Sequence, residues 1–540
     1  SDSAATLRAA RRAQASFEWF RGHHLPERDD YPSGHCDLNI GRYCFWYGDR
    51  KFDSVPEPPM IQEERGRLLA ALATATARLP GDDWIVGQRV RYLVEEGRRT
   101  EAVAIARACR GTPWWCAALA GFALHAAAEF ASADSAFEAA LVAMPDEERC
   151  RWRDVAVVLP PALRERYDRM SCTERADFES RWWWLTTPLA SRPGNDRRTE
   201  HFSRLTLDRL LRDSRSARRD PWGDDQRELL LRFGPEVSWS RRPSSPFTQS
   251  DPLVTGHERV PAFHFVPSSR AFDDPGRSRT DDWALDDARP NEWYAPPYAD
   301  RFLPLNAQLA AFRRGDSCLV AAVYDVSADP TLGHQPAQTA LVVAQGERWH
   351  VVRSRETHLD GREALIATGR CEPELVSLEV VSSKARWVAR LRQGIEPPGP
   401  GSVSDLLLVD PRDSLARDLR SLLPYALASN RIPVGSHVRL FWEVPGLDPA
   451  GEPVTTSLAV TAEPRGWLGR TAESIGLARR RRGVELRWDE VLRPQAGVAP
   501  RLLDLDLSAL SAGRYRIDLA VSVGGGVPLT ATREIELVAR

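Results

Sequence analysis

The sequence predicts a multidomain protein in which an N-terminal helical region is followed by two antiparallel β-sandwiches. At 540 residues the chain is longer than one hydrophobic core normally supports, so several domains are expected. From Ile61 to Met144 the apolar residues recur at helical spacing. From Leu305 onward the pattern changes to alternation, with turn residues at short intervals. This change of period predicts an α-then-β order of domains.

Residues 1–60 are predicted to be an irregular segment that a disulfide staples. The stretch from His35 to Tyr47 is compact, aromatic and punctuated by Gly41. It contains Cys36 and Cys44, which are near neighbours in the sequence. A stapled surface loop fits this pattern.

Residues 61–150 are predicted to form a short run of helical pairs, separated by breaks at 80–82 and 111–113. The second pair resembles the tetratricopeptide repeat, in which small residues let two helices cross closely and a proline ends the second helix. The residues that carry this resemblance are Gly121, Leu124, Ala133, Phe137, Ala140 and Pro145. Such solenoids usually present a concave face to another protein. The alternative is a capped helical bundle that only supports its neighbour.

Residues 151–240 are predicted to form a helical segment that is dense in Trp, Arg and Asp. Its richest part begins at Arg181-Trp182-Trp183-Trp184 and closes on Arg232-Phe233-Gly234-Pro235. It resembles the GWxTD domain of uncharacterised bacterial envelope proteins, in which a Trp- and Arg-rich helical stretch leads to a Gly-Trp-x-Thr-Asp turn, a short strand and a Gly-Pro. In this chain the order is Trp222-Gly223, and Asp224 replaces the Thr. The residues assigned to the family's motif are Asn195, Asp196, Glu200, His201, Pro221, Trp222, Gly223, Asp224, Asp225, Gly234 and Pro235. The resemblance implies no reaction, because none is assigned to the family.

Residues 241–304 are predicted to be a long, irregular but ordered connection. A segment so rich in Pro and charge buries too little apolar surface to become ordered by itself. We therefore expect it to pack along the GWxTD-like segment or a sandwich, or under a neighbouring subunit. The expected anchors are Trp283, Trp293, Tyr294 and Tyr298.

The remaining chain is predicted to form two sandwiches of immunoglobulin-like size, at residues 305–411 and 412–540. Strands are expected in the first at 318–326, 339–344, 375–381 and 405–409, and in the second at 437–444, 457–460, 483–488, 515–521 and 534–538. The stretch 507–515, which ends on Tyr515, resembles the corner before a late strand in fibronectin-like domains. In those domains a Tyr near a tight turn anchors the edge of the sandwich.

The eight cysteines fall into four near-neighbour pairs. The pairs are Cys36 with Cys44, Cys109 with Cys116, Cys150 with Cys172, and Cys318 with Cys371. None has the Cys-x-x-Cys spacing of zinc ribbons or thioredoxin-type sites. An even number of locally pairable cysteines predicts disulfides and an oxidising compartment. Buried free thiols are the alternative.

Composition argues against nucleic acid as a partner. The chain has 73 basic and 75 acidic residues, and they are interspersed rather than gathered on one basic stretch. The run Arg479 to Arg482 is read as a solvated loop flank, with contact to an anionic surface as the alternative. No apolar run is long enough to span a bilayer. The chain begins at Ser1 without Met, so a signal peptide either has been removed or preceded this residue.

One group of residues has the composition of a glycosidase site. Asp224, Asp225, Glu228, Glu200 and His201 lie among Trp residues, and glycosidases use two carboxylates flanking the bond that they cleave. The alternative is structural: Asp224 or Asp225 caps a turn or pairs with Arg, while Trp222 fills the junction between the helices and the next domain. For that ion pair the candidate partners are Arg197, Arg198 and Arg204. We favour the structural interpretation.

Two further groups of residues are candidates for a chemical role. Cys318, His350 and Asp360 could form a nucleophile set of the papain or transglutaminase type, but Cys318 enters a strand and has a disulfide partner in Cys371.

The second group is a possible metal site made of His23, His24, His35 and Cys36. No carboxylate pattern fixes the orientation of these side chains, and Pro26 and Pro32 interrupt the segment, so a solvent-exposed loop is favoured.

The sequence therefore predicts a non-enzymatic structural or protein-interaction subunit of a bacterial envelope or extracellular assembly, which is secreted, periplasmic or at the cell surface. Its partners would be other protein subunits, and no cofactor or metal is expected. The alternative function is a carbohydrate-active protein, either a glycan-binding module or a glycoside hydrolase that uses exposed Trp side chains with Asp224 and Asp225.

Overall fold

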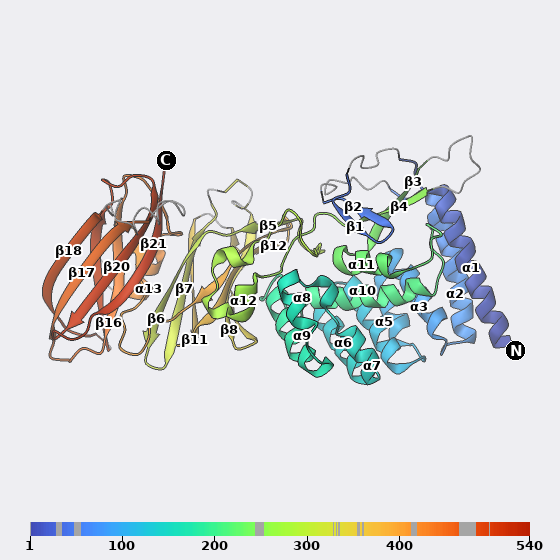
Figure 1. Cartoon of the computed structure of the whole chain (residues 1–540), viewed down its shortest axis with the longest axis horizontal. Helices are drawn as coiled ribbons and strands as arrows, with labels where there is room; N and C mark the ends of the chain where they lie inside the picture. Colours follow the sequence, from blue (N-terminus) through green and yellow to red (C-terminus); the bar gives the residue numbers. More distant parts are fainter. Residues whose placement is uncertain are drawn as a thin grey trace. The chain divides into compact units, whose positions relative to one another are not determined.

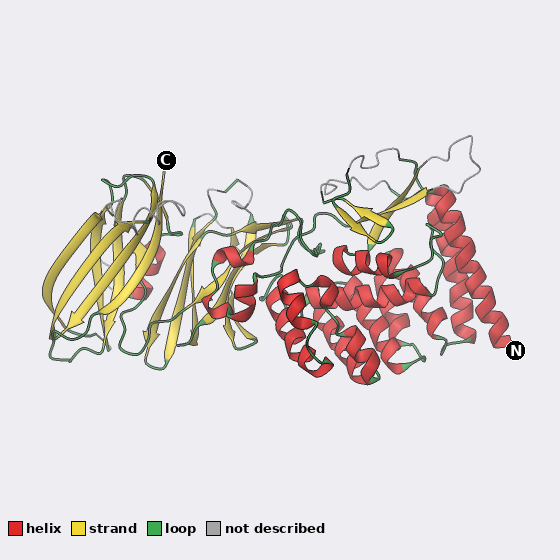
Figure 2. Cartoon of the chain, viewed as in Figure 1, coloured by secondary structure: helices red, strands yellow, loops and turns green. Residues whose placement is uncertain are grey.

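The computed structural model contains two compact units. The helical unit comprises Ser1–Phe272 and Ala284–Asp300, and the β unit comprises Asp273–Trp283 and Arg301–Arg540. The structure describes residues 2–28, 35–47, 56–242, 253–327, 329–330, 332, 335–353, 357–358, 361–411, 418–463, 482–495 and 497–539. Helices make up most of the first unit and strands most of the second (Figure 1, Figure 2), so the predicted α-then-β order is confirmed.

The helical unit is a series of helices, and short turns connect those from α2 to α9. They are α1 (Asp2–His24), α2 (Pro59–Arg78), α3 (Asp83–Glu95), α4 (Arg99–Arg107), α5 (Pro113–Ala126), α6 (Phe130–Ala143), α7 (Asp146–Trp152), η1 (Ala156–Val158), α8 (Pro161–Tyr167), α9 (Cys172–Thr186), α10 (Asp196–Arg212) and α11 (Asp224–Phe233). Polar N-caps fix where several of them begin. The side chain of Asp82 accepts from Ile85 N at 3.0 Å, and Ser171 and Glu174 form a capping box at the start of α9.

Helix α10 lies at the centre of this unit, where it packs against α3, α5, α6, α9 and α11. Its Phe202 is fully buried and lies 5.5 Å, between ring centroids, from Phe137 of α6. Helices α5 and α6 approach closely because Gly121 leaves space for the Phe137 ring, which a Cβ at position 121 would meet at 2.8 Å. The core of the unit is thus built around the segment that the sequence marks as rich in Trp and Arg.

Helix α1 differs from the prediction that residues 1–60 are irregular. Residues 2–24 form a helix whose buried face repeats every three or four residues. The buried residues are Thr6, Ala10, Gln14, Phe17, Glu18, Arg21 and Gly22. This face escapes a hydrophobicity pattern because half of it is polar, and its helical period appears only when the buried polar residues are counted with the apolar ones.

Two small β-hairpins lie on the helical unit. Strands β1 (Leu38–Ile40) and β2 (Tyr43–Phe45) pair within the stapled loop, and β3 (Glu236–Arg242) pairs with β4 (Leu253–Glu258). Phe45 stacks on Phe233 of α11 at 3.9 Å between centroids, which attaches the first hairpin to the end of α11.

All eight cysteines form the four predicted near-neighbour disulfides, Cys36–Cys44, Cys109–Cys116, Cys150–Cys172 and Cys318–Cys371. A chain with four disulfides and no free thiol fits an oxidising compartment outside the cytoplasm. Within the residues that the structure describes, no helix combines the length and apolar character needed to cross a membrane.

The connection at 241–304 is ordered where it is described, and the predicted anchors are buried or bonded. It contains α12 (Ser269–Asp273), η2 (Pro275–Arg277) and η3 (Thr280–Trp283). In the helical unit Trp293 Nε1 donates to Phe233 O at 3.0 Å, and Tyr298 Oη donates to Asp196 at 2.9 Å. In the β unit the Arg392 guanidinium lies 5.5 Å from the Trp283 ring centroid. The segment therefore contributes to both cores rather than acting as a free linker.

The first part of the β unit is a pair of packed sheets. Its strands are β5 (Arg301–Pro304), β6 (Ala307–Arg314), β7 (Ser317–Asp325), β8 (Pro336–Gln345), β9 (Arg348–Arg353), β10 (Thr357–His358), β11 (Arg362–Arg370), β12 (Glu374–Ser382) and β13 (Trp387–Ile395). One sheet has the order β10-β8-β12-β13-β5 with β9 also on β8, and the other has the order β11-β7-β6. Alternating side chains such as Val320, Leu341 and Leu378 form the apolar layer between them.

The second part of the β unit is also built from two sheets. Its strands are β14 (Leu407–Val409), β15 (Arg431–Pro433), β16 (His437–Pro445), β17 (Glu452–Ala462), β18 (Arg482–Leu492), β19 (Val498–Asp506), β20 (Gly513–Val523) and β21 (Leu529–Val538), with α13 (Leu419–Leu422) and η4 (Leu423–Tyr425) after β14. The sheet orders are β14-β16-β19 and β15-β21-β20-β17-β18. Trp442 and Leu458, one from each sheet, belong to the core between them.

Strand β14 lies before the predicted boundary at residue 411 but pairs with β16 of the second sandwich. The reason is that Leu406 and Leu408 fill the core of the second sandwich, while Leu407 and Val409 face an apolar layer shared with Phe312 of β6. A strand that is apolar on both faces can belong to either neighbour, so its sequence does not place the boundary.

Candidate functional site

The candidate site is an open groove on the helical unit, which we call the α10–α11 groove. It has a volume of about 680 Å³. Its lining comes from α7, η1, α8, α10, α11 and the residues next to them: Glu148, Arg151, Trp152, Asp154, Ala156, Val157, Arg164, Leu205, Asp208, Arg209, Arg212, Asp213, Asp224, Arg227 and Glu228. Most of these side chains are charged, and both signs are present.

Asp208 of α10 organises one wall of the groove. Its carboxylate accepts from Trp222 Nε1 at 2.8 Å and pairs with Arg212 at 2.9 Å and with Arg227 at 3.5 Å. Trp222 is half-buried against this wall. Trp222 therefore joins the α10 helix to the turn that leads into α11, which is a junction within the helical unit and not one with the next domain.

Arg209 of α10 lies over two Trp rings, with its guanidinium carbon 4.6 Å from the centroids of Trp114 and Trp115. Cation–π contacts of this kind hold an arginine in place without neutralising it. Arg209 also lines a second hollow of about 100 Å³, together with Trp84 and Asp213. It is a fixed positive charge at the border of the groove.

The adjacent carboxylates Asp224 and Asp225 point to different surroundings. Asp224 is exposed and lines the groove. Asp225 accepts from Arg42 Nε at 2.6 Å and from Arg42 Nη2 at 2.9 Å, and these hydrogen bonds lower the pKa of Asp225 below its usual range. The sequence suggested Arg197, Arg198 or Arg204 as partners, and the structure instead gives Arg42, which lies in the stapled loop.

Those three arginines have other partners. Arg197 pairs with Glu292, and both side chains are fully buried. Arg198 pairs with Asp134 and Glu138 of α6, and Arg204 Nε donates to Glu200 at 2.8 Å. The pairs of Arg197 and Arg198 connect α10 to the 284–300 segment and to α6, whereas the Arg204–Glu200 pair lies within α10.

Glu200 and His201 lie inside the helical unit. Glu200 pairs with His125 Nε2 at 2.7 Å. Burial alone would raise the pKa of Glu200, but Arg204 and His125 together lower it below the usual range. His201 is fully buried 4.9 Å from the Trp183 ring, and burial together with Arg197 and Arg204 lowers its pKa well below the usual value. Neither residue faces the groove, so the structure does not assemble the proposed set of Asp224, Asp225, Glu228, Glu200 and His201.

Other residues of the predicted motif cap and close helices. Asn195 accepts from Arg198 N at 3.0 Å as the N-cap of α10, while its Nδ2 donates to Trp183 O at 2.6 Å. Gly234 ends α11 with φ +100°, and a Cβ there would lie 3.0 Å from an Arg204 nitrogen. Pro235 follows it before β3 begins. The glycine is therefore required both by the backbone and by the close arginine.

The other two candidate groups are not assembled in the described structure. Cys318 is bonded to Cys371, His350 lies in β9, and Asp360 is outside the described residues. His23 and His24 belong to the end of α1 rather than to a loop, and their Nδ1 atoms lie 2.7 and 2.8 Å from Trp19 O and Phe20 O. His35 precedes Cys36, which is bonded to Cys44. Among the described residues no three His, Cys, Asp or Glu side chains are grouped as a metal site would require. Arg479–Arg481 of the basic run are outside the described residues, and Arg482 begins β18.

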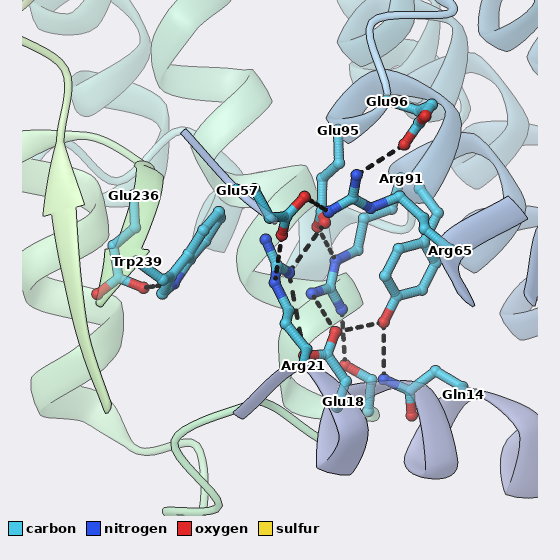
Figure 3. A network of polar contacts seen from close by, with 12 residues as sticks. Gln14, Glu18, Arg21, Glu57, Arg65, Arg91, Glu95, Glu96, Glu236 and Trp239 are labelled. Carbon is cyan, nitrogen blue, oxygen red and sulfur yellow. Dashed lines mark hydrogen bonds and ion pairs between the residues drawn. The ribbon is translucent and has the colours of Figure 1, made fainter. Parts of the chain in front are cut away.

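A second polar cluster, which sequence reasoning missed, joins α1 to α2 and α3 (Figure 3). Its charged members are Arg21, Arg65, Arg91, Glu18, Glu57, Glu95 and Glu96. Arg21 Nη1 lies 3.2 Å from Glu95, and Arg65 Nη1 lies 2.6 Å from Glu96. Burial raises the pKa of Glu18, whereas at Glu95 three arginines outweigh burial and lower the pKa. Every charged side chain in this cluster has a partner of opposite charge, so the cluster has a structural role and attaches α1 to α2 and α3.

Comparison with known proteins shows no family. No family model matches the chain, and no curated protein matches it. Solved structures with a local likeness include the soluble domain of PmoD from Methylocystis sp. ATCC 49242 (Rockwell), with 13% identity, a TM-score of 0.15 and coverage of 26% of this chain and 94% of that chain. Red sea bream transglutaminase has 8% identity, a TM-score of 0.15 and coverage of 44% and 32%. Escherichia coli alpha-2-macroglobulin activated by porcine elastase has 11% identity, a TM-score of 0.16 and coverage of 42% and 22%. TM-scores this low carry no argument about function.

Proposed function

We propose that this chain is a non-enzymatic, protein-interaction or structural subunit of a bacterial envelope or extracellular assembly, and that its α10–α11 groove holds a segment of a partner protein. The observation that carries this proposal is the lining of the groove. Sites for small molecules are lined mostly by apolar and aromatic residues, whereas eleven of the fifteen residues that line this groove are charged. Interspersed charges of both signs suit a polar partner surface and select it by charge complementarity.

The finer architecture is part of the same proposal. We take the helical pairs α3–α4 and α5–α6 as tetratricopeptide-like, with Gly121 against Phe137 as the close crossing. We take both sandwiches as immunoglobulin-like, and in the second Tyr515 Oη donates to Ser511 O at 2.9 Å, as expected of an anchoring corner tyrosine. The segment with Trp222 and Asp225 is taken as GWxTD-like, and the protein as periplasmic, secreted or on the cell surface.

The carbohydrate-active alternative has less support. A glycan-binding surface needs exposed Trp rings, but Trp182, Trp183, Trp283 and Trp293 are at most 5% exposed. Trp222 is only half-buried, but its Nε1 already donates a hydrogen bond to Asp208. The two carboxylates suggested for hydrolysis are divided between the groove and Arg42.

Site-specific photo-crosslinking in the native organism tests the proposal. A photoreactive residue at Arg212, which is exposed in the groove, should give one discrete adduct with a partner protein. The charge reversal Arg164→Glu should lower the yield of that adduct, because it changes the lining without touching the core. The same residue at Val142, which is 76% exposed on α6, is the matched control and should give no adduct.

Two results would contradict the proposal. One is equal crosslinking from Arg212 and Val142, which would mean that the groove is not a specific surface. The other is turnover of a polysaccharide or peptide by the purified protein that Asp224→Asn abolishes without loss of stability, which would favour an enzyme.

A further inference from the structure

The smaller hollow that Arg209 borders, which we call the α1–α10 hollow, lies where α1, α3 and α5 meet the end of α10 (Figure 1). Its volume is about 100 Å³. Since a water molecule takes about 30 Å³ in the liquid, the hollow has room for a group about as large as three waters. It therefore suits a small chemical group rather than a drug-sized molecule. The lining residues are Arg11, Asp83, Trp84, Gln88, Trp115, Arg209, Leu210 and Asp213.

Two arginines of this lining lie over indole rings. The guanidinium carbon of Arg11 lies 4.9 Å from the Trp84 ring centroid, and that of Arg209 lies 4.6 Å from the Trp115 ring centroid. Within the described part of the chain, neither guanidinium has a hydrogen bond or an ion pair. A guanidinium over an aromatic ring keeps its positive charge, and its N–H groups stay available to an acceptor. Two such arginines therefore bring unneutralised positive charge to one small hollow.

Other polar side chains of the lining are used within the protein. The two oxygens of the Asp83 carboxylate accept from Thr112 N at 2.8 Å and from Thr112 Oγ1 at 2.6 Å. Gln88 Nε2 donates to Leu210 O at 2.8 Å, and Gln88 Oε1 accepts from Arg91 at 3.3 Å. These bonds direct Asp83 and Gln88 toward neighbouring backbone and side chains, so the two arginines are the donors left for a ligand.

The position of Arg11 follows from the way α1 is attached. Further along α1, Gln14 Nε2 donates to Tyr92 Oη at 2.9 Å and to Arg215 O at 2.8 Å. Gln14 Oε1 accepts from Arg215 N at 3.1 Å, and the Gln14 side chain is buried. These bonds fix α1 against α3 and against the segment after α10. Although Arg11 itself is exposed, the helix that carries it is held beside Arg209 in the folded chain.

Asp213 is the remaining charged residue of the lining. It caps the end of α10 one turn after Arg209, and its side chain is exposed. Its backbone O accepts from Trp84 Nε1 at 2.8 Å, whereas its carboxylate forms no ion pair among the described residues. This carboxylate competes with an incoming anion for the arginines. Removing its charge should therefore strengthen the binding of an anion.

We propose that the α1–α10 hollow binds a small oxyanion and prefers a phosphate group. The guanidiniums of Arg11 and Arg209 donate to its oxygens, because their planar N–H forks match the geometry of phosphate. A phosphate group carries a charge of about −1.5 to −2 at pH 7, which two arginines balance. A carboxylate carries less charge and is the weaker ligand. The site goes beyond the proposed partner groove, since neither Arg11 nor Trp84 lines that groove.

Isothermal titration of the full-length chain with sodium phosphate tests the site, at a low ionic strength that sodium chloride holds constant. Arg11→Gln and Arg209→Gln should each raise the dissociation constant by about tenfold, because each removes hydrogen bonds to a charged group. Asp213→Asn should lower the constant by about threefold. The matched control is Arg12→Gln, which removes the same charge from an exposed neighbour outside the hollow and should leave the constant unchanged.

Two further titrations define the ligand. Sodium acetate should bind more weakly than phosphate, because it carries a single charge. Methyl phosphate distinguishes the source of the group: its binding means that the site accepts a phosphate ester, and binding of inorganic phosphate alone means that the ligand is the free ion. Because Arg11 is at the surface, Arg11→Gln tests the site even if a change at Arg209 disturbs the packing of the Trp rings.

The proposal is overturned if phosphate shows no saturable binding to the wild-type chain. It is also overturned if Arg11→Gln and Arg12→Gln weaken binding equally, which would mean general attraction to basic side chains, or if acetate binds as tightly as phosphate. None of these measurements requires a partner protein, so a failure here is distinct from a failure of partner binding in the α10–α11 groove.

Discussion

The helical unit and the β unit stabilise their interiors in different ways. In the helical unit, charged side chains lie inside and pair across long stretches of sequence, as with Arg197 and Glu292 or Arg21 and Glu95. In the β unit, apolar layers occupy the sandwiches and buried charges are fewer. They include one fully buried pair, Arg392 with Glu379, whereas Arg533 donates to an amide and a backbone oxygen. The difference teaches that a sequence rich in Trp and charged residues need not form a reactive surface. In the helical unit, many of these side chains lie inside the fold and pair with one another.

The largest expected effect is in the helical unit, at the pair Arg197 and Glu292. Arg197→Ala leaves a buried carboxylate without its partner, so the free energy of unfolding should fall by about 3–5 kcal/mol. Far-ultraviolet circular dichroism during chemical denaturation measures this change, since helices dominate that signal. The control is Arg197→Met with Glu292→Leu, which removes both charges and should cost much less. Equal losses for the single and double variants would show that packing, and not charge, sets the effect.

A second expected effect is that the free energy of unfolding depends on pH because of Glu179 in α9. Burial raises the pKa of Glu179 from 4.5 to about 7. The folded protein then holds the proton more tightly than the unfolded chain does, so the free energy of unfolding falls as pH rises from about 4.5 to about 7. The glutamine in Glu179→Gln cannot ionise, so this substitution should remove the loss of unfolding free energy at high pH. It should stabilise the protein by up to about 3 kcal/mol at pH 8 and by little at pH 4.

Glu174 in the same helix is the matched control for the sign. Hydrogen bonds from Ser171 lower the pKa of Glu174, so its contribution is present at neutral pH and is lost as pH falls. Glu174→Gln should therefore destabilise the protein at neutral pH and have less effect in acid. A stabilisation by Glu179→Gln that is the same at pH 4 and pH 8 would contradict the assignment of its raised pKa.

What could be predicted from the sequence was local. The disulfide Cys109–Cys116 has its partners 7 residues apart, and strands such as β12 and β20 follow from alternation that a short window contains. The partner of Asp225 could not be found this way, because Arg42 is 183 positions distant and lies in a loop with no charge pattern of its own. Helix α1 was missed for a related reason, since its buried Glu18 is compensated by Arg91 of another helix.

The residues of the candidate groove also could not be predicted from local sequence patterns alone. The sequence singled out Asp224 and Asp225 together, but neighbouring residues at a helix start point in different directions, and only the fold assigns one to the groove and one to Arg42. Arg209 and Asp208 were not singled out at all. Both residues lie on the face of α10 that also carries Arg212. This face is recognised as the wall of a groove only once the fold has placed α7 and α11 beside α10.

The most direct test of the account compares Asp224→Asn with Asp225→Asn in the chain that carries the photoreactive residue at Arg212. We predict that Asp224→Asn leaves the melting temperature unchanged and lowers the yield of the groove adduct, because this carboxylate lines the groove and is exposed. Asp225→Asn should lower the melting temperature by weakening the contact to Arg42 and leave the adduct in place. The reverse assignment, or a loss of stability from both changes with no effect on the adduct, would contradict the division between a structural motif and a binding groove.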